Sequence, residues 1–308
     1  SSIIFLFLSI FLMRFSGQGM MSHTATTTIS RYFTKSRGKA LSTGWFGLSA
    51  AEFILPLLMI YMLSLIDWRN IWIFISIIVL IFLPLISFFL VRNINLDSRE
   101  EVEKNKSDKK KIKQWKRLEV IKDYRFYVIC SNMLAMPWIA TGVFVYQSFI
   151  LTSKNWGPYI IAQSFMAYSI FSVITLFLSG FLIDKFSSRK LLIYMNIPLL
   201  FSAIVIYFFD NSVSAFFFLG LIGISNGLAN VLGSSTWAEI YGVKYIGSIK
   251  ALTTALMVFA TAFGTALFGF LIDRGFSIEQ ISLISGSYIS LSIVLLFLVR
   301  NKLNPTII

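Results

Sequence analysis

Three residues able to carry a charge, Arg14, His23 and Glu52, lie inside apolar stretches of the chain. Inserting a charged side chain at the centre of a bilayer costs about 2.5–3.5 kcal/mol, so such residues often mark paths for ions or protons. Glu52 is the strongest candidate for binding and releasing a proton, and His23 can titrate near neutral pH. The alternatives are an arginine that reaches for the membrane surface and a histidine hydrogen-bonded between helices. The three residues therefore predict proton transfer or charge pairing.

A second charged cluster follows the apolar run that ends near residue 183. Asp184 and Lys185 come first, and Arg189 and Lys190 follow after three further residues. An acidic side chain at a helix end can pair with nearby guanidinium groups, and such a pair can hold one conformation closed. The alternative is a basic anchor at the membrane surface with an aspartate at its edge. We expect these four residues to form a gate.

Six polar or aromatic side chains lie at depths in the apolar stretches that suit a small solute. Asn226 and Asn230 are one helical turn apart and therefore share a face. Hydrogen bonds between helices, worth about 0.6 kcal/mol on average in membrane proteins, explain such residues equally well. The predicted substrate-cavity residues are Gln18, Tyr146, Gln147, Asn226, Asn230 and Trp237.

Long apolar segments must position these residues, and the sequence contains nine of them. Most are near the roughly 20 residues that cross the hydrocarbon core as a helix. Lipid cannot satisfy backbone polar groups, so spanning segments are helices or closed barrels, and these segments lack the alternation of barrel strands. The predicted fold is an all-α bundle of transmembrane helices. The predicted spans are 1–30, 40–64, 70–92, 126–151, 158–183, 190–208, 213–238, 248–272 and 279–299.

The composition agrees with a membrane protein, because 56% of the residues are hydrophobic and 16% are aromatic. The net charge of +13 comes mainly from short loops, where basic residues meet anionic lipid, so we expect no nucleic-acid partner. A single cysteine excludes a disulfide within the chain. One histidine, no phosphate-binding loop and no zinc-ligand spacing argue against an enzyme, a cofactor or a metal ion. A membrane-embedded transferase would need a catalytic loop, which the sequence does not show.

The loops alternate between many and few basic residues along the chain. The richer side is expected to be cytoplasmic, together with the C-terminus. The charged segment 93–122 predicts a cytoplasmic linker between 1–92, with three helices, and 123–308, with six. An odd number of spans and a first residue, Ser1, that is not methionine lead us to expect further sequence upstream. The richer loops lie near 31–39, 92–125, 185–190, 244–250 and 300–302.

Two short internal repeats favour a duplicated architecture. Residues 39–43 (KALST) match 250–254 (KALTT), and each segment opens a predicted span after a basic loop. Residues 180–185 (GFLIDK) match 269–274 (GFLIDR), and each segment closes a predicted span, on opposite sides of the membrane. Parallel and inverted repeats of this kind are typical of one large class of transporters.

Two motifs carry a family resemblance. The segment 180–190 is similar to the G-x-L-x-D-[RK]-x-x-x-R-[RK] loop of the major facilitator superfamily, and 14–19 (RFSGQG) is similar to its fourth-helix pattern. The chain resembles helices 4–12 of a twelve-helix member, truncated at its N-terminus. The resemblance implies two bundles that rock around a midplane site, with Arg14 in proton transfer or charge pairing. The Gly-Pro pair common in the fifth helix of antiporters is missing, so the direction of transport stays open.

We therefore expect a secondary active transporter, coupled to protons and working by alternating access. Its partner would be a small organic solute, and Arg14 favours an organic anion. A facilitated uniporter and a drug or metabolite efflux antiporter are alternatives, as is a non-transporting membrane fragment. We expect a monomer in the bacterial inner membrane.

Overall fold

The structure is a computed structural model that describes residues 3–33, 36–91, 112–157 and 159–306. Most of the predicted linker 93–122, namely residues 93–111, lies outside the described residues. The predicted division into 1–92, 93–122 and 123–308 stays a prediction. Inside the helices, the side chains outside the description are those of Gln18, Glu52, Pro56, Leu57, Ile60, Leu90, Val91 and Ala162.

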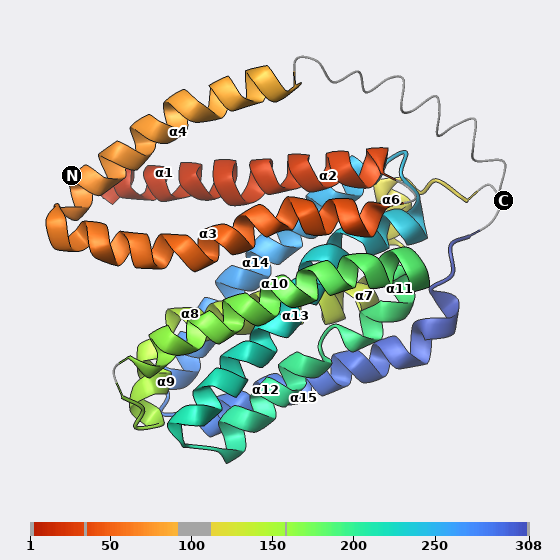
Figure 1. Cartoon of the computed structure of the whole chain (residues 1–308). Coiled ribbons are helices and arrows are strands. Elements are labelled where there is room, and N and C mark those ends of the chain that lie inside the picture. Colours follow the sequence, from red (N-terminus) through yellow and green to blue (C-terminus); the bar gives the residue numbers. More distant parts are fainter. Residues whose placement is uncertain (1–2, 34–35, 92–111, 158, 307–308) are drawn as a thin grey trace. The chain divides into compact units, whose positions relative to one another are not determined.

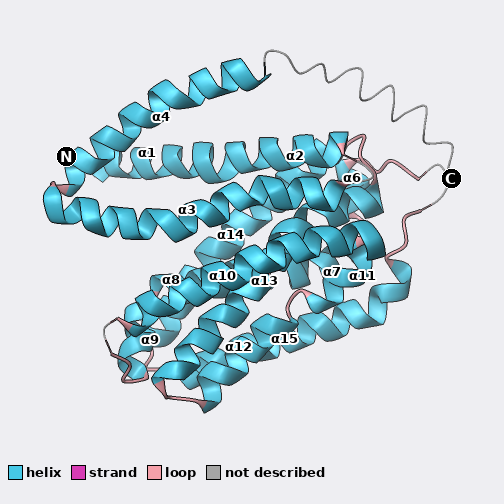
Figure 2. Ribbon diagram, viewed as in Figure 1, coloured by secondary structure: helices cyan, strands magenta, loops and turns pink. Residues whose placement is uncertain are grey.

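The described residues form helices and no β-strand (Figures 1 and 2). The helices, in chain order, are α1 (Ile3–Met13), η1 (Arg14–Met21), α2 (Ser22–Tyr32), α3 (Arg37–Leu65), α4 (Trp68–Val91), α6 (Arg117–Ile121), α7 (Tyr124–Met133), α8 (Ala135–Val145), α9 (Gln147–Ser153), α10 (Ile160–Phe186), α11 (Ser188–Leu191), η2 (Leu192–Tyr194), α12 (Ile197–Phe208), α13 (Ser212–Tyr241), α14 (Ile246–Asp273), α15 (Ile278–Val299) and η3 (Arg300–Lys302).

Eight helical stretches of the described residues are long and apolar enough to cross a membrane. The remaining predicted span, 40–64, lies within α3, a helix of 29 residues in which several side chains are not described. The all-α, polytopic fold class is therefore confirmed. The eight stretches are Ile3–Tyr32, Trp68–Phe89, Tyr124–Val145, Gln163–Phe186, Ser188–Phe208, Ser212–Tyr241, Ile246–Asp273 and Ile278–Lys302.

The first stretch is not a regular α-helix throughout. Residues Arg14–Met21 form a π-helix between α1 and α2. Gly17 and Gly19 lie in this segment, and glycine lowers the preference for a regular α-helix by about 1 kcal/mol relative to alanine. Single π-helical turns are frequent at functional sites. This π-helix coincides with the motif at residues 14–19.

Polar residues and glycines set the ends of the later helices. The Asn211 side chain accepts a hydrogen bond from the backbone N–H of Ser214 at 2.8 Å and so caps the start of α13. Gly242 follows the last residue of α13 with a φ of +84°, a conformation that glycine adopts without strain. Ser277 and Gln280 form a capping box at the start of α15. These short-range signals divide the apolar sequence into separate spans.

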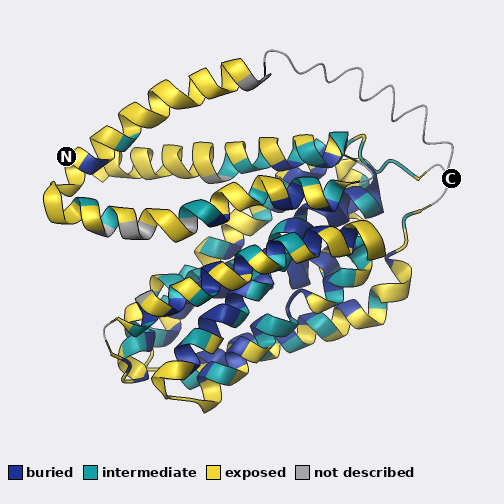
Figure 3. Cartoon of the chain, viewed as in Figure 1, coloured by how far each residue is buried: buried dark blue, intermediate teal, exposed yellow. Residues whose placement is uncertain are grey.

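The chain divides into two compact units, of which the first comprises Ser1–Phe46 and Lys111–Ile308. In this unit α13 lies at the centre and packs against α10, α12, α14, α11 and α2. Close backbone approach makes the α10–α13 pair tight, because a Cβ atom on Gly223 or Gly227 would overlap the α10 backbone. Buried residues follow the inward faces of these helices (Figure 3). The long interior helices therefore form a bundle around α13.

The second unit comprises Gly47–Lys110, and its described part holds the later portion of α3 and all of α4. Between the two helices, the Asp67 carboxylate accepts a hydrogen bond from the backbone N–H of Arg69 at 2.9 Å. Most described side chains of α4 are exposed and apolar (Figure 3). An apolar helix of this length without a core suits contact with lipid or with other helices.

Basic loops gather at one end of the first unit, which we call the basic end. The Arg125 guanidinium donates to the carbonyl oxygens of Lys302 and Asn304 at 3.2 and 3.0 Å. The backbone N–H of Lys244 donates to the Gln114 side chain at 3.0 Å. Segments that the alternation of charge assigned to one membrane face therefore meet in space.

Candidate functional site

The Asp184 side chain joins the end of α10 to the start of α3 at the basic end. Its carboxylate accepts hydrogen bonds from the backbone N–H groups of Gly38 and Lys39, at 2.8 and 3.2 Å. The first N–H groups of a helix have no partner within the helix, and the helix dipole places partial positive charge there. Asp184 therefore acts as a capping group supplied by a distant helix.

Two glycines permit this approach. A Cβ atom on Gly38 would overlap the carbonyl oxygen of Gly180, and one on Gly180 would lie 2.9 Å from the carbonyl oxygen of Gly38. The Ser42 side chain, one turn along α3, lies next to the same place on Gly180. We call the contact formed by Asp184, Gly180, Gly38, Lys39 and Ser42 the latch. Its tightness depends on bare backbone at both glycines.

The rest of the predicted gate is arranged differently from the expectation. Arg189 pairs with Glu239 at the end of α13, with 3.0 Å between Nε and Oε1. Glu239 also accepts hydrogen bonds from the N–H and hydroxyl groups of Ser188. Lys185 lies over the Phe186 ring and Lys190 is exposed. The carboxylate of Asp184 thus caps a backbone, while Glu239 binds the guanidinium group.

The predicted proton and charge residues lie on the first helices. Arg14 begins the π-helix and is exposed in the described structure. His23 lies in the first turn of α2, half-buried, and its Nδ1 has no hydrogen-bond partner among the described residues. The side chains of Gln18 and Glu52 lie outside the described residues. The roles predicted for these four residues stay predictions.

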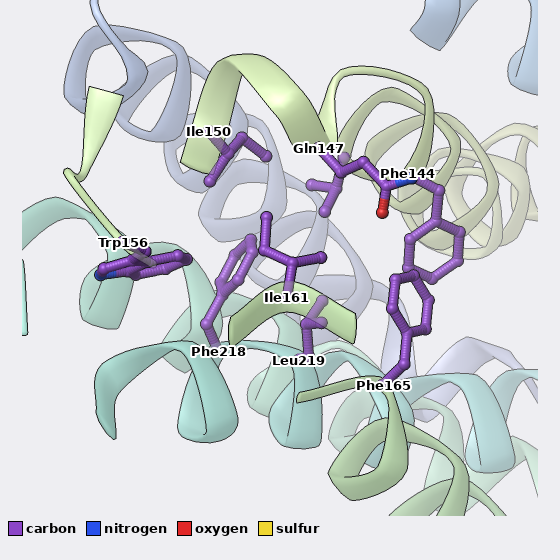
Figure 4. Close-up of a pocket in the computed structure, with 9 residues that line it drawn as sticks. Phe144, Gln147, Ile150, Trp156, Ile161, Phe165, Phe218 and Leu219 are labelled. Carbon is purple, nitrogen blue, oxygen red and sulfur yellow. The ribbon is translucent and has the colours of Figure 1, made fainter. Parts of the chain in front are cut away.

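Gln147 lines a small apolar pocket, to which α8, α9, α10 and α13 contribute (Figure 4). The free cavity is only about 10 Å³, and Gln147 supplies the single amide side chain among its lining residues. Drug-sized ligands generally occupy about 300–1,000 Å³. In this conformation the pocket suits a methyl group or a small apolar moiety rather than a complete organic solute. The lining residues are Val143, Phe144, Gln147, Ile150, Trp156, Ile161, Phe165, Phe218 and Leu219.

The other predicted cavity residues contact neighbouring helices. The Tyr146 ring stacks on Phe268 of α14. The Asn226 side chain donates to the Ser172 hydroxyl of α10 at 3.0 Å, as the interhelical alternative anticipated. Asn230 is half-buried one turn further along α13.

Trp237 is 2% exposed and packs against Phe126 and Tyr241 in the core near the basic end. The pocket residue Phe218 is 19 residues earlier in α13, which corresponds to roughly 28 Å of helix. The structure therefore does not bring Trp237 and Gln147 together at one pocket in this conformation. Their assignment to a substrate cavity stays a prediction.

Sequence reasoning grouped Lys250 with the basic loop residues, but the structure places it inside α14. Its side chain is buried, and its Nζ has no hydrogen-bond partner among the described residues. A lysine four residues into an apolar helix is the sequence signal that could have found it. The two lysines at matching positions of the repeat therefore differ, because Lys39 is exposed and Lys250 is buried.

An ion-pair cluster closes the end of the first unit opposite the basic end. The Lys154 side chain is 0% exposed, and its Nζ lies 2.6 Å from Asp210 and 2.8 Å from Glu279. Burial alone would lower the pKa of Lys154, but hydrogen bonds and ion pairs with the two carboxylates outweigh it and raise that pKa. The cluster connects the loop after α9, the loop before α13 and the start of α15.

Residues 1–265 match the family model described as Major Facilitator Superfamily. A comparison with curated proteins found no match. The matched range includes both motifs, the latch and most of the helical spans described above. The chain is therefore an integral membrane protein that belongs to the major facilitator superfamily, a family of membrane transporters rather than enzymes.

Proposed function

We propose that the protein is a proton-coupled secondary transporter of a small organic solute, and that it works by alternating access. The observation that carries this proposal is the latch between the start of α3 and the end of α10. Alternating access requires contacts that close one end of the bundle in one state and break in the other. The latch has the properties of such a contact.

Its energy is suited to reversible opening. Hydrogen bonds to a charged group contribute about 1.5–3 kcal/mol each when shielded, and less when water can replace them. Asp184 is exposed, so water can satisfy its carboxylate after separation. A few kcal/mol is also the range in which differential binding of a ligand shifts a two-state equilibrium. Solute or proton binding can therefore decide whether the latch is closed.

Proton coupling rests on residues selected from the sequence. Arg14 and His23 belong to the candidate membrane span Ile3–Tyr32, and Glu52 belongs to α3. An ionisable side chain inside a membrane span is costly to keep without a role. Glu52 would bind the coupling proton, His23 would take part in its relay, and Arg14 would pair with charge. Arg14 also favours an anionic solute over a neutral one.

We further propose that the basic end faces the cytoplasm of a bacterial cell, with the linker and the C-terminus on that side. This follows from the positive-inside rule, because Arg31, Lys185, Lys244 and Arg300 lie in loops or helix ends on that side. We expect the protein to be a monomer in the inner membrane and to have no nucleic-acid partner.

Proton coupling is tested in proteoliposomes with four radiolabelled anions: lactate, succinate, citrate and inorganic phosphate. Uptake is measured with and without an imposed pH gradient for wild type, Glu52→Gln and the control Asp273→Asn. Gradient-driven uptake that Glu52→Gln loses and Asp273→Asn keeps supports the proposal. Uptake that is the same with and without the pH gradient, and that Glu52→Gln retains, contradicts proton coupling and identifies a uniporter.

A further inference from the structure

Helices α2 and α14 pack against each other near the basic end. The Thr27 methyl group lies 3.7 Å from the position that a Cβ atom on Gly247 would occupy. One turn back on α2, His23 lies within electrostatic range of Lys250, which is three residues further along α14 than Gly247. Residues three or four apart share a helix face. His23 and Thr27 of α2 therefore face Gly247 and Lys250 of α14.

Lys250 is 4% exposed, and its Nζ makes no hydrogen bond to the described residues. An ammonium group removed from water is stable only when an anion or several hydrogen-bond acceptors replace the water. The side chain therefore lacks the partner that its chemistry demands.

None of the described groups around Lys250 supplies that partner. His23 Nδ1 and Thr27 Oγ1 are also buried without a hydrogen-bond partner among the described residues. Arg37, at the start of α3, lies within electrostatic range of Lys250 and adds positive charge. The surroundings of Lys250 thus contain a second cation, Arg37, and two polar side chains that are able to donate a hydrogen bond.

Three described carboxylates near this end of the unit have other partners. Asp184 accepts its hydrogen bonds from the start of α3, and Glu239 binds Arg189 and Ser188. Asp123 pairs with Arg125 at 2.8 Å. Among the described residues, the positive charge of Lys250 is therefore left for a ligand.

We propose that His23, Thr27 and Lys250 form a binding site for the anionic group of a small organic solute between α2 and α14. The Lys250 ammonium supplies the charge, and the Thr27 hydroxyl and the His23 imidazole supply directional hydrogen bonds. Charge-assisted hydrogen bonds of this kind are the strong ones in anion recognition. This inference rests on the proposed transport function, because it assigns a site to the transported solute.

The site joins helices that precede and follow the linker. A solute bound there contacts α2 and α14 together, so its binding energy depends on how these helices are placed. That dependence is what a transporter needs in order to link solute occupancy to a change of conformation.

Binding is tested on purified protein in phosphatidylcholine nanodiscs, with lactate, succinate, citrate and inorganic phosphate as probes. Each probe is titrated against sodium chloride at equal ionic strength, and the dissociation constant follows from the rise in the thermal unfolding midpoint. The variants are Lys250→Met, which removes the charge, and Lys250→Arg, which keeps it. Thr27→Val removes one hydroxyl at nearly constant volume. Lys244→Gln, at an exposed lysine before the same helix, is the control.

We expect at least one carboxylate or phosphate probe to stabilise the wild type and Lys244→Gln equally. The dissociation constant should rise at least tenfold in Lys250→Met and several-fold in Thr27→Val, and should stay within about threefold in Lys250→Arg. Failure of all four probes to stabilise the wild type overturns the proposal. Dissociation constants in Thr27→Val and Lys250→Met that equal the wild-type value overturn it as well. If Lys250→Met does not fold, Thr27→Val and Lys250→Arg decide.

Lipid is distinguished from solute by repeating the titration in nanodiscs that contain phosphatidylglycerol. Stabilisation by this lipid that depends on Lys250, with no effect of the soluble probes, assigns the site to a lipid headgroup and overturns the solute proposal. Failure of the transport function is recognised separately. Lys250-dependent binding without gradient-driven uptake contradicts the transport function alone, whereas uptake with Lys250-independent binding contradicts this site alone.

Discussion

The carboxylate of Asp184 and the backbone N–H of Gly38 form a hydrogen bond of 2.8 Å across a sequence separation of 146 residues. The bond connects a helix before the linker to a helix after it. It is also the contact that a conformational change would have to break.

Asp184→Asn is expected to weaken the latch, because the neutral amide loses the interaction with the positive start of α3. The loss should be about 1 kcal/mol, the usual size of a charge–helix interaction. Hydrogen–deuterium exchange of the Gly38 and Lys39 amides should therefore accelerate roughly fivefold. Asp273→Asn, at the matching position of the repeat, is the control and should leave exchange unchanged. Equal protection in wild type and Asp184→Asn would show that the carboxylate does not hold the contact.

Gly38→Ala is expected to destabilise the closed arrangement by about 1–3 kcal/mol, the usual cost of overpacking. The added methyl group meets the carbonyl oxygen of Gly180, so backbone must move. Gly233→Ala in α13 is the matched control, because nothing lies within 4 Å of its Cβ position. There the substitution should be neutral or stabilising by up to about 1 kcal/mol. Unfolding midpoints in detergent measure both, and equal effects of the two substitutions would contradict the close approach.

The pair Arg189–Glu239 should show coupling in a double-mutant cycle. Both side chains are about a fifth exposed, so we expect a coupling free energy of about 1 kcal/mol. Glu239→Gln should cost more than Arg189→Gln, because Glu239 also accepts from Ser188. Unfolding in mixed micelles with Arg189→Gln, Glu239→Gln and the double variant gives the value. Strict additivity would mean that the two side chains do not interact.

Lys154→Met should lower stability by about 1–3 kcal/mol at neutral pH. The cost stays moderate because Asp210 is 77% exposed and can be hydrated once its partner is gone. The pKa of Lys154 is raised in the folded protein, so its stabilisation is complete below the unfolded pKa near 10.4 and is lost as pH rises through the raised value. The difference in unfolding midpoint between wild type and Lys154→Met should therefore be constant from about pH 7 to 10 and shrink above that. A difference that does not fall at high pH would contradict the ion-pair cluster.

The sequence alone was sufficient to predict the membrane spans, because the pattern of apolar residues that defines a span is local. Runs of apolar residues, together with breaks such as Asn211 and Gly242, determine where a helix can begin and end. The family follows from two short motifs for the same reason. The π-helix at Arg14–Met21 was not predicted, because it depends on small differences between helical forms.

The partners of the charged residues could not be read from the sequence. Asp184 was expected to bind a guanidinium group, yet it caps the start of α3, since only the fold brings Gly38 and Gly180 together. Lys250 was grouped with the loop residues because its burial arises only in the folded bundle. The partner of Asp184 and the burial of Lys250 therefore depend on long-range packing, which a local sequence pattern does not reveal.

Opening of the latch during transport is tested most directly by locking it. The Cβ position of Gly180 lies 3.1 Å from the Cβ atom of Ser42, slightly closer than the usual 3.5–4.5 Å of a disulfide. The same Cβ position lies 2.9 Å from the carbonyl oxygen of Gly38, so the backbone must shift slightly to admit a side chain there. With that shift, Ser42→Cys/Gly180→Cys, made with Cys130→Ala and compared with each single cysteine variant, can cross-link α3 to α10. We predict that oxidation abolishes uptake in proteoliposomes and that reduction restores it, while the single variants do not respond. Wild-type uptake by the cross-linked protein would contradict alternating access through this contact.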